Sequence, residues 1–191
     1  MEPHLAVGAP ACVAPAAQAR FVRLNTTSGE RPILSKRPIS KTRFATLARA
    51  LIGKRISHSW RGHGSAIFLE LGPLRPSRNG PQPRGEASVM IQWSWRIEKV
   101  RSIQLGSWSS ERKINAGIRA LKGLKVVEVT VEGRLPELEL HLNSGLWIHS
   151  FATVEGQPEW ALFLRDGSWI TVERGRLVHD RQNVRHRRAS A

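Results

Sequence analysis

Residues 49–54 read RALIGK, and the same pattern returns in residues 119–124 as RALKGL. Before each copy, apolar residues recur every three or four positions, which is the period of an amphipathic helix. After each copy the residues alternate between polar and apolar, as in a half-buried strand: residues 54–60 read KRISHSW and residues 125–131 read KVVEVTV. The repeated motif therefore predicts, twice in one chain, a helix that ends at a glycine and leads into a strand.

The helix that precedes each glycine has its own start signal. In the first, Phe44, Leu47 and Leu51 share one face, and Thr42 is the expected N-cap. In the second, Ile114, Ile118 and Leu121 form the apolar stripe, and Ser109 or Ser110 is the expected N-cap.

Further strands are expected in the same order after both helices. They are residues 66–71 (AIFLEL), 88–97 (SVMIQWSWRI) and 105 in the first unit, and residues 138–142 (LELHL), 146–154 (LWIHSFATV) and 163–164 in the second. Both units then reach Gly-Ser-Trp, at residues 106–108 and 167–169. We expect an α+β, β-rich fold built from two tandem pseudo-repeats, residues 42–108 and 109–173. Each is a helix followed by about four mostly antiparallel strands, and together they form one compact sheet, a sandwich or a partial barrel.

The charge of the 191-residue chain lies mostly outside these units. Lys and Arg number 30 and Asp and Glu 15, a net charge of +15. Residues 1–48 hold 7 − 2 = +5 and residues 174–191 hold 6 − 1 = +5, so the 125 residues between carry only 17 − 12 = +5. The flanks are rich in Ala, Pro and polar residues, which bury little apolar surface. We expect a disordered extension at 1–40, a single globular domain at 41–178 and a disordered basic tail at 179–191.

Several classes of protein are excluded or disfavoured by composition. The single cysteine, Cys12, excludes a disulfide framework, and no apolar run is long enough to span a bilayer. The N-terminus lacks the basic start of a signal peptide, and Pro10 and Pro15 interrupt its apolar stretch, so we expect a cytoplasmic protein.

One loop differs between the units. Residues 143–145 form a tight turn in the second unit, whereas residues 72–87 of the first (GPLRPSRNGPQPRGEA) form a long insertion rich in proline and arginine. A long loop of this kind is either functional or disordered.

Candidates for chemistry are few. His58, His63 and Glu70 could ligate a metal, but a glycine-flanked turn that carries His63 explains the pattern equally well. Glu137 and Glu139 alternate with leucines and are expected on the solvent side of a strand rather than as an acid–base pair. We therefore assign no catalytic residue, cofactor or metal, and a metal-dependent hydrolase is the least favoured function.

Tryptophan and arginine suggest a binding surface instead. Trp93 and Trp95 lie two apart on one expected strand and so share a face. Arginines next to tryptophans could grip a nucleic acid or a protein, although Trp108 and Trp169 occupy equivalent repeat positions and are expected to be structural. The candidate surface comprises Trp60, Arg61, His63, Arg75, Arg78, Arg84, Trp93, Trp95 and Arg96.

Three strings resemble a group of uncharacterised bacterial proteins: residues 59–72 (SWRGHGSAIFLELG), 93–98 (WSWRIE) and 158–162 (PEWAL). The resemblance covers residues 45–178 and implies a bacterial, cytoplasmic protein. It implies no activity, cofactor or functional residue.

The first expected function is a non-enzymatic interaction or accessory module. It would bind a protein partner through the strand face near Trp93 and Trp95 and the loop at 72–87. The alternative is nucleic-acid binding, motivated by the +15 charge.

Overall fold

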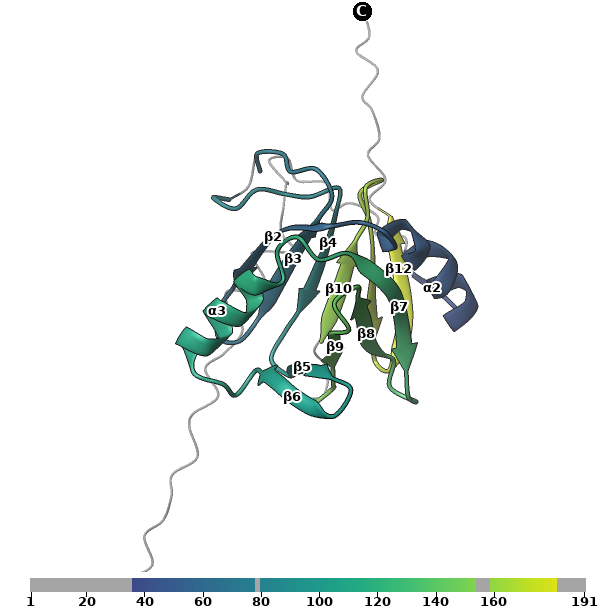
Figure 1. Cartoon of the computed structure of the whole chain (residues 1–191). Helices are drawn as coiled ribbons and strands as arrows, with labels where there is room; N and C mark the ends of the chain where they lie inside the picture. The colour runs from purple at the N-terminus through teal and green to yellow at the C-terminus, as the bar shows by residue number, and fades with distance from the viewer. Residues whose placement is uncertain (1–35, 78–79, 154–158, 182–191) are drawn as a thin grey trace, which may run out of the picture. The chain divides into compact units, whose positions relative to one another are not determined.

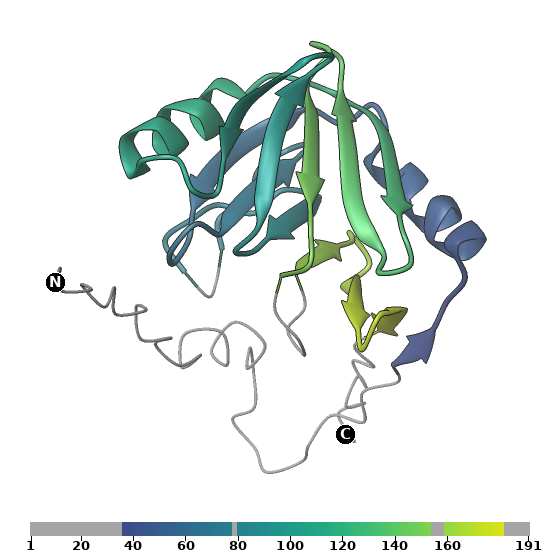
Figure 2. The ribbon, with the colours of Figure 1, turned by 90° about the horizontal axis from the view of Figure 1, so that it is seen from below.

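The computed structural model describes residues 36–77, 80–153 and 159–181 (Figures 1 and 2). The helices are α2 (Lys41–Ala48), the 3-10 helix η1 (Arg49–Leu51) and α3 (Glu111–Ala120). A seven-stranded sheet has the order β1 (Arg37–Pro38), β12 (Arg176–Arg181), β11 (Ser168–Glu173), β10 (Trp160–Phe163), β4 (Ala87–Ile91), β3 (Ile67–Leu71) and β2 (Ile56–Arg61). A five-stranded sheet has the order β6 (Ser102–Gly106), β5 (Trp95–Lys99), β9 (Trp147–Ser150), β8 (Glu137–Leu142) and β7 (Val126–Glu132).

Every pairing between these strands is antiparallel. The expected β-rich fold with antiparallel strands is therefore confirmed, in the form of two sheets and not a closed barrel.

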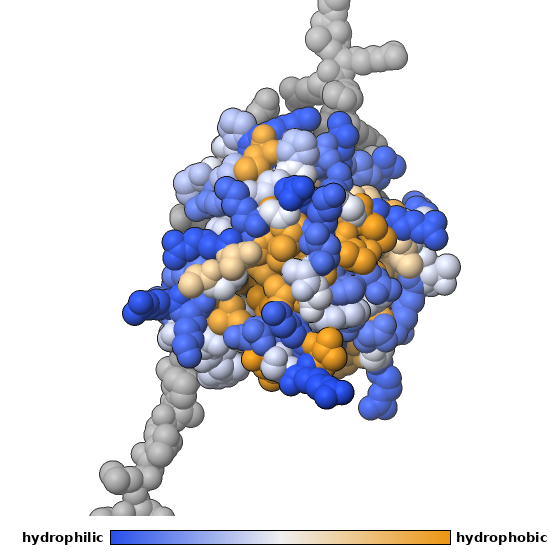
Figure 3. Space-filling model, in the orientation of Figure 1, coloured by the Kyte–Doolittle hydropathy of each residue, from blue (hydrophilic) through white to orange (hydrophobic). Residues whose placement is uncertain are grey.

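One apolar core joins both sheets and both helices. It includes Leu69 from β3, Leu140 from β8 and Ile118 from α3, all at most 2 % exposed. Phe44 of α2 packs edge-on against the indole of Trp160, with 5.8 Å between ring centroids. In Figure 3 apolar residues gather in the middle of the view, and hydrophilic residues surround them.

Both helices begin at a serine. The side chain of Ser40 accepts a hydrogen bond from the backbone N–H of Arg43, so Ser40 is the N-cap of α2 and the expectation of Thr42 was wrong. The N-cap of α3 is Ser110, one of the two residues expected. After each helix the chain turns at a glycine with positive φ, Gly53 at +79° and Gly123 at +95°, a conformation that favours glycine.

The two helix-to-strand junctions bind each other through the backbone. Gly53 N–H donates to Val126 O, and Gly123 N–H donates to Ile56 O, both at 2.8 Å. A β-bridge pairs Arg55 with Lys125. These bonds connect β2, an outer strand of one sheet, to β7, an outer strand of the other.

Residues 88–97, which we expected to be one strand, are two strands in different sheets. β4 pairs with β10, and β5 pairs with β9. The chain changes sheet at residues 92–94 and returns between β9 and β10. The two crossings are hydrogen-bonded to each other: Gln92 N–H donates to Glu159 O and Phe151 N–H donates to Ser94 O.

The folded region is wider than expected. Residues 36–40 and 179–181 were assigned to the flanks, yet β1 pairs with β12 through Arg37–His179 and Pro38–Val178. Asp180 is only 1 % exposed. Residues 1–35 and 182–191 lie outside the described residues.

The two Gly-Ser-Trp tripeptides do not occupy matching positions. Gly106 ends β6, and Trp108 beyond it is 94 % exposed. Gly167, in contrast, precedes β11, and Trp169 lies within that strand. Trp108 is therefore not a core residue.

In the described part of the chain, no helix has the length and apolar character needed to cross a bilayer.

Candidate functional site

The predicted surface of tryptophans and arginines divides among several places. Trp95 is fully buried, and its indole Nε1 donates to Ser65 O at 2.6 Å, so its place in a surface was wrong. Trp93 is half-buried against the turn at residues 62–65, where the Ser65 hydroxyl donates to Trp93 O at 3.0 Å. His63 is exposed in that same turn. Trp93 and His63 are thus close along this turn, while Trp95 belongs to the core.

Trp60 and Arg61 are held by neighbouring residues. The Trp60 ring stacks on Phe68 with 3.9 Å between centroids. Arg61 Nη1 donates to Gly64 O at 2.8 Å and to the carboxylate of Glu111 at 3.0 Å. These contacts fix the end of β2 against the following turn and the start of α3.

The long loop is anchored to the seven-stranded sheet. Arg75 and Arg84 face each other in a short bridge, with backbone hydrogen bonds of 2.8 and 2.9 Å. Glu70, which has no exposed surface, accepts hydrogen bonds from the backbone of Gly85 (2.9 Å), the hydroxyl of Ser88 and the guanidinium of Arg84 (3.3 Å). A buried carboxylate needs such donors, so Glu70 fixes the loop. Arg78 lies outside the described residues.

At the edge of this loop, Glu86 forms ion pairs with Lys54 and with Arg165, the latter at 3.4 Å. The hydrogen bond from Lys54 is the main cause that lowers the pKa of Glu86, and the nearby positive charges add to it.

The three residues that were considered as possible metal ligands, and not assigned as such, are used separately. His58 Nε2 lies 2.9 Å from Gln82 Oε1, Glu70 holds the loop, and His63 is in the exposed turn. Within the described ranges, no three His, Cys, Asp or Glu side chains form a group that could hold a metal ion.

A different set of polar side chains lies together on the outer face of the five-stranded sheet. Along β8, Leu138, Leu140 and Leu142 point into the core, so Glu137 and Glu139 lie on the solvent side, as predicted. The cross-strand pairs extend this face to the neighbouring strands. We call the following side chains the outer sheet face: Glu128, Thr130 and Glu132 of β7, Glu137, Glu139 and His141 of β8, Trp147 and His149 of β9, and Arg96 and Glu98 of β5.

This face is acidic in a basic protein. It carries five glutamates and one arginine, a formal charge of 1 − 5 = −4, whereas the whole chain has +15. Glu132 and Glu137 are direct cross-strand partners. Like charges in that position repel each other, so the sheet gains no stability from this pair.

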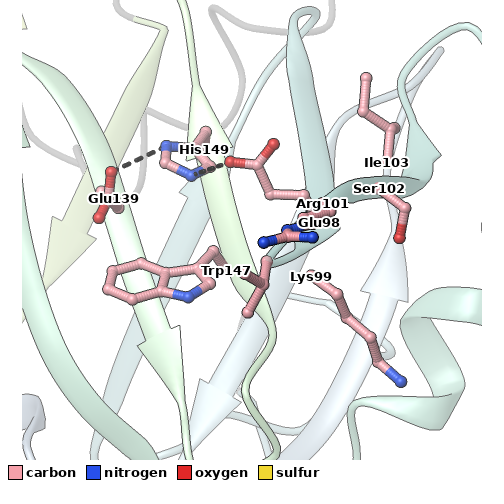
Figure 4. A pocket seen from close by; sticks show the side chains of 9 residues that line it. Glu98, Lys99, Arg101, Ser102, Ile103, Glu139, Trp147 and His149 are labelled. Atoms are coloured by element: carbon pink, nitrogen blue, oxygen red, sulfur yellow. Dashed lines mark ion pairs between the residues drawn. The ribbon is translucent and has the colours of Figure 1, made fainter.

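His149 sits at the centre of an ion-pair network. Its Nε2 lies 2.6 Å from Glu98 of β5, and its Nδ1 lies 3.0 Å from Glu139 of β8 (Figure 4). Glu98 also accepts a hydrogen bond from Arg96 Nε at 3.1 Å. Carboxylates only accept, so both ring nitrogens donate together only when the ring carries two protons. The network links three adjacent strands and orients their side chains.

A shallow hollow of about 500 Å³ lies beside this network. Trp147, which stacks on His141 with 3.9 Å between centroids, lines one side. The turn between β5 and β6 forms the opposite wall with Lys99 and Arg101 (Figure 4), and Val100 also lines the hollow. Charged groups of both signs, an aromatic ring and a hollow of this size suit the binding of another molecule's side chains.

Of this face, sequence reasoning identified only Arg96 as a binding residue. Glu139 and His149 could have been found, because the tight turn at residues 143–145 makes their strands neighbours and each alternates with buried residues. Glu98 could not have been found in this way, because β5 lies beside β9 only as a result of the change of sheet at residues 92–94.

Comparisons of the chain with protein-family models, with curated proteins and with solved structures found no match. The residue roles described above therefore rest on the geometry of this chain.

Proposed function

We propose that the protein is a non-enzymatic interaction module that binds a protein partner through the outer sheet face. The observation that carries the proposal is the concentration of five glutamates around Trp147 and His149 in a chain of net charge +15. An acidic surface attracts a basic segment of a partner and fixes its position. Trp147 supplies the aromatic contact that often anchors such segments.

The site of binding thereby differs from the one expected from the sequence. Trp95 is in the core and Glu70 holds the loop at 72–87 against its sheet. Glu128 and Glu132 of β7, by contrast, are exposed to solvent. A partner can reach them without disturbing the core.

The test is fluorescence anisotropy with two labelled peptides of equal length, one alternating Arg and Ser and one alternating Glu and Ser. The Arg peptide is expected to bind, and the double variant Glu128→Gln/Glu132→Gln is expected to bind it about tenfold more weakly because two charge contacts are lost. Glu173→Gln, on the seven-stranded sheet, where Glu173 pairs with Lys36, is a control for the loss of a carboxylate elsewhere and is expected to leave the affinity unchanged. Equal affinity of the wild type and the double variant would contradict the proposal.

Nucleic-acid binding is the second candidate, favoured by the net charge of +15. In this proposal the basic residues that lie outside the acidic outer sheet face supply the phosphate contacts. Residues 1–35 and 182–191 hold 6 of the 30 Lys and Arg and a net charge of 6 − 2 = +4, so a chain of residues 36–181 keeps 24 − 13 = +11. The full-length chain and the chain of residues 36–181 would be compared for binding to single-stranded DNA, and binding by the full-length chain alone would contradict recognition by the folded region.

We also propose that the fold contains two copies of one helix-and-strand unit. Two observations support this: the reciprocal bonds of Gly53 and Gly123, and the register shifts that follow Ile56 in β2 and Val126 in β7. The sheet orders agree as well, since β4-β3-β2 and β9-β8-β7 are each extended by a hairpin from the other unit.

A further inference from the structure

We propose that the partner bound by the outer sheet face is a second copy of this chain. This inference rests on the proposed function and names the basic segment that the acidic strands take: the turn between β5 and β6 of the other copy, with Lys99 and Arg101.

The charges on the outer sheet face are sorted by strand. β9 is the middle strand of the five. On one side of it lie three basic residues, Arg96 on β5 and then Lys99 and Arg101 at the turn, and one carboxylate, Glu98 on β5, which pairs with Arg96 and His149. On the other side, β8 and β7 carry only carboxylates among their charged outward residues apart from His141: Glu137, Glu139, Glu128 and Glu132. The face therefore has a basic edge and an acidic edge.

Such a face is complementary to itself. A two-fold axis parallel to β9 and just above the sheet would place β5 and β6 of one copy over β8 and β7 of the other. Each basic edge then meets an acidic edge, and the same contact is made twice, as a closed two-fold interface requires. A two-fold axis perpendicular to the strands would instead place like charges opposite each other.

Exposed apolar residues occupy the same two edges. Val100 and Ile103, at the β5–β6 turn, are 88 % and 67 % exposed. Val127, on β7, is 43 % exposed. The two-fold arrangement brings the turn of one copy to β7 of the other, so these side chains cover one another along with the charges around them.

Neither helix stands in the way. α2 packs against β7 and α3 against β6 and β2, so both lie at the edges of the five-stranded sheet, as Figure 2 shows. Five strands spaced about 4.8 Å apart, with four to seven residues of about 3.3 Å each, give a footprint of roughly 400 Å² per copy. The two copies together would cover roughly 800 Å², less than the roughly 1,200 Å² of a standard specific interface, so the dimer is expected to be weak and transient, with a dissociation constant on the order of micromolar or higher.

The test is sedimentation velocity of the full chain over a series of concentrations, with two charge-reversed variants. Lys99→Glu/Arg101→Glu reverses the basic edge, and Glu128→Lys/Glu132→Lys reverses the acidic edge; all four residues are exposed, so both variants are expected to fold. The wild type is expected to form a concentration-dependent dimer and each variant to be monomeric. An equimolar mixture of the two variants is expected to recover one heterodimer, because reversed edges again meet opposite charges.

A matched control is Arg112→Glu/Lys113→Glu, which makes the same charge change at exposed positions of α3 and is expected to leave the dimer intact. A dimer that survives both edge reversals would overturn the inference, since it would form through another surface. A chain that stays monomeric but binds the Arg peptide through Glu128 and Glu132 would overturn the second copy as partner and leave the proposed function standing. A chain that does neither would overturn both.

Discussion

Two glutamates, Glu70 and Glu86, are charged side chains whose carboxylates are stabilised by nearby hydrogen-bond donors. Glu70 has no exposed surface, yet three donors, from Gly85, Ser88 and Arg84, surround its carboxylate. These hydrogen bonds compensate the cost of burying the carboxylate of Glu70, and they also fix the positions of the three donors. Glu86 differs because it lies near solvent and depends chiefly on one cation, Lys54.

Replacing Lys54 by methionine is expected to lower the free energy of unfolding at neutral pH. The native pKa of Glu86 is below its ordinary value, chiefly because Lys54 donates a hydrogen bond to it. A carboxyl with a lowered native pKa contributes stability above its unfolded pKa, and that contribution is lost as the pH falls through the native pKa. The loss of unfolding free energy caused by Lys54→Met, measured by urea unfolding, should therefore be smaller at a pH below the native pKa of Glu86 than at neutral pH. A difference of equal size at both pH values would refute this role of Lys54.

At the scale of elements, the loop of residues 72–86 is the clearest case of sequence and structure differing. Its prolines and glycines suggested a functional or disordered insertion, but Glu70 ties Gly85 to β3 and the Arg75–Arg84 bridge closes the loop on itself. The sequence alone did not reveal this anchor, because Glu70 occupies the place of an ordinary polar residue in an alternating strand.

Two glycines of this loop should respond differently to alanine. A Cβ at Gly85 would lie 2.5 Å from the backbone oxygen of Leu71 and 2.6 Å from its nitrogen, and backbone atoms of a central strand cannot move aside. Gly85→Ala is expected to lower the free energy of unfolding by about 2–4 kcal/mol. At Gly80 no atom lies within 4 Å, so Gly80→Ala is expected to change it by less than about 0.5 kcal/mol. Thermal and urea unfolding would measure the free energy of unfolding of both variants. Similar losses in the two variants would contradict the close approach of Gly85 to Leu71 as the cause of the destabilisation.

At the scale of the whole molecule, local patterns predicted most elements and long-range pairing escaped them. The glycines of RALIGK and RALKGL end helices in the structure because a positive φ is a local requirement. The alternation in residues 138–142 placed Glu139 on the solvent side because that pattern depends only on neighbouring residues. The pairing of β5 with β9 depends on where the chain changes sheet, which alternation does not encode. The change of sheet interrupts the alternation of buried and exposed residues. Two pairs of consecutive residues, Ile91–Gln92 and Ser94–Trp95, are buried there.

Cutting the chain between Trp108 and Ser109 tests how far the two halves depend on each other. β5 and β6 from the first half complete the sheet of β7, β8 and β9 from the second, and β10 and β11 extend the sheet of β2, β3 and β4. Each half alone is expected to lack cooperative unfolding, whereas the two fragments expressed together are expected to co-purify and unfold in one transition. Circular dichroism of the separate and joint fragments would measure this. A cooperative transition in either fragment alone would contradict the expectation.

The double crossing between the sheets also sets an order of events during synthesis. When the first half has left the ribosome, β4 still lacks β10, its neighbour on the side away from β3, and β5 still lacks β9. β9 and β10 are translated later, so β4 and β5 of the nascent chain have unpaired, exposed edges until these two strands emerge. Such a chain depends on completing translation, or on a chaperone that shields those edges, more than a protein whose strands pair in the order in which they are made.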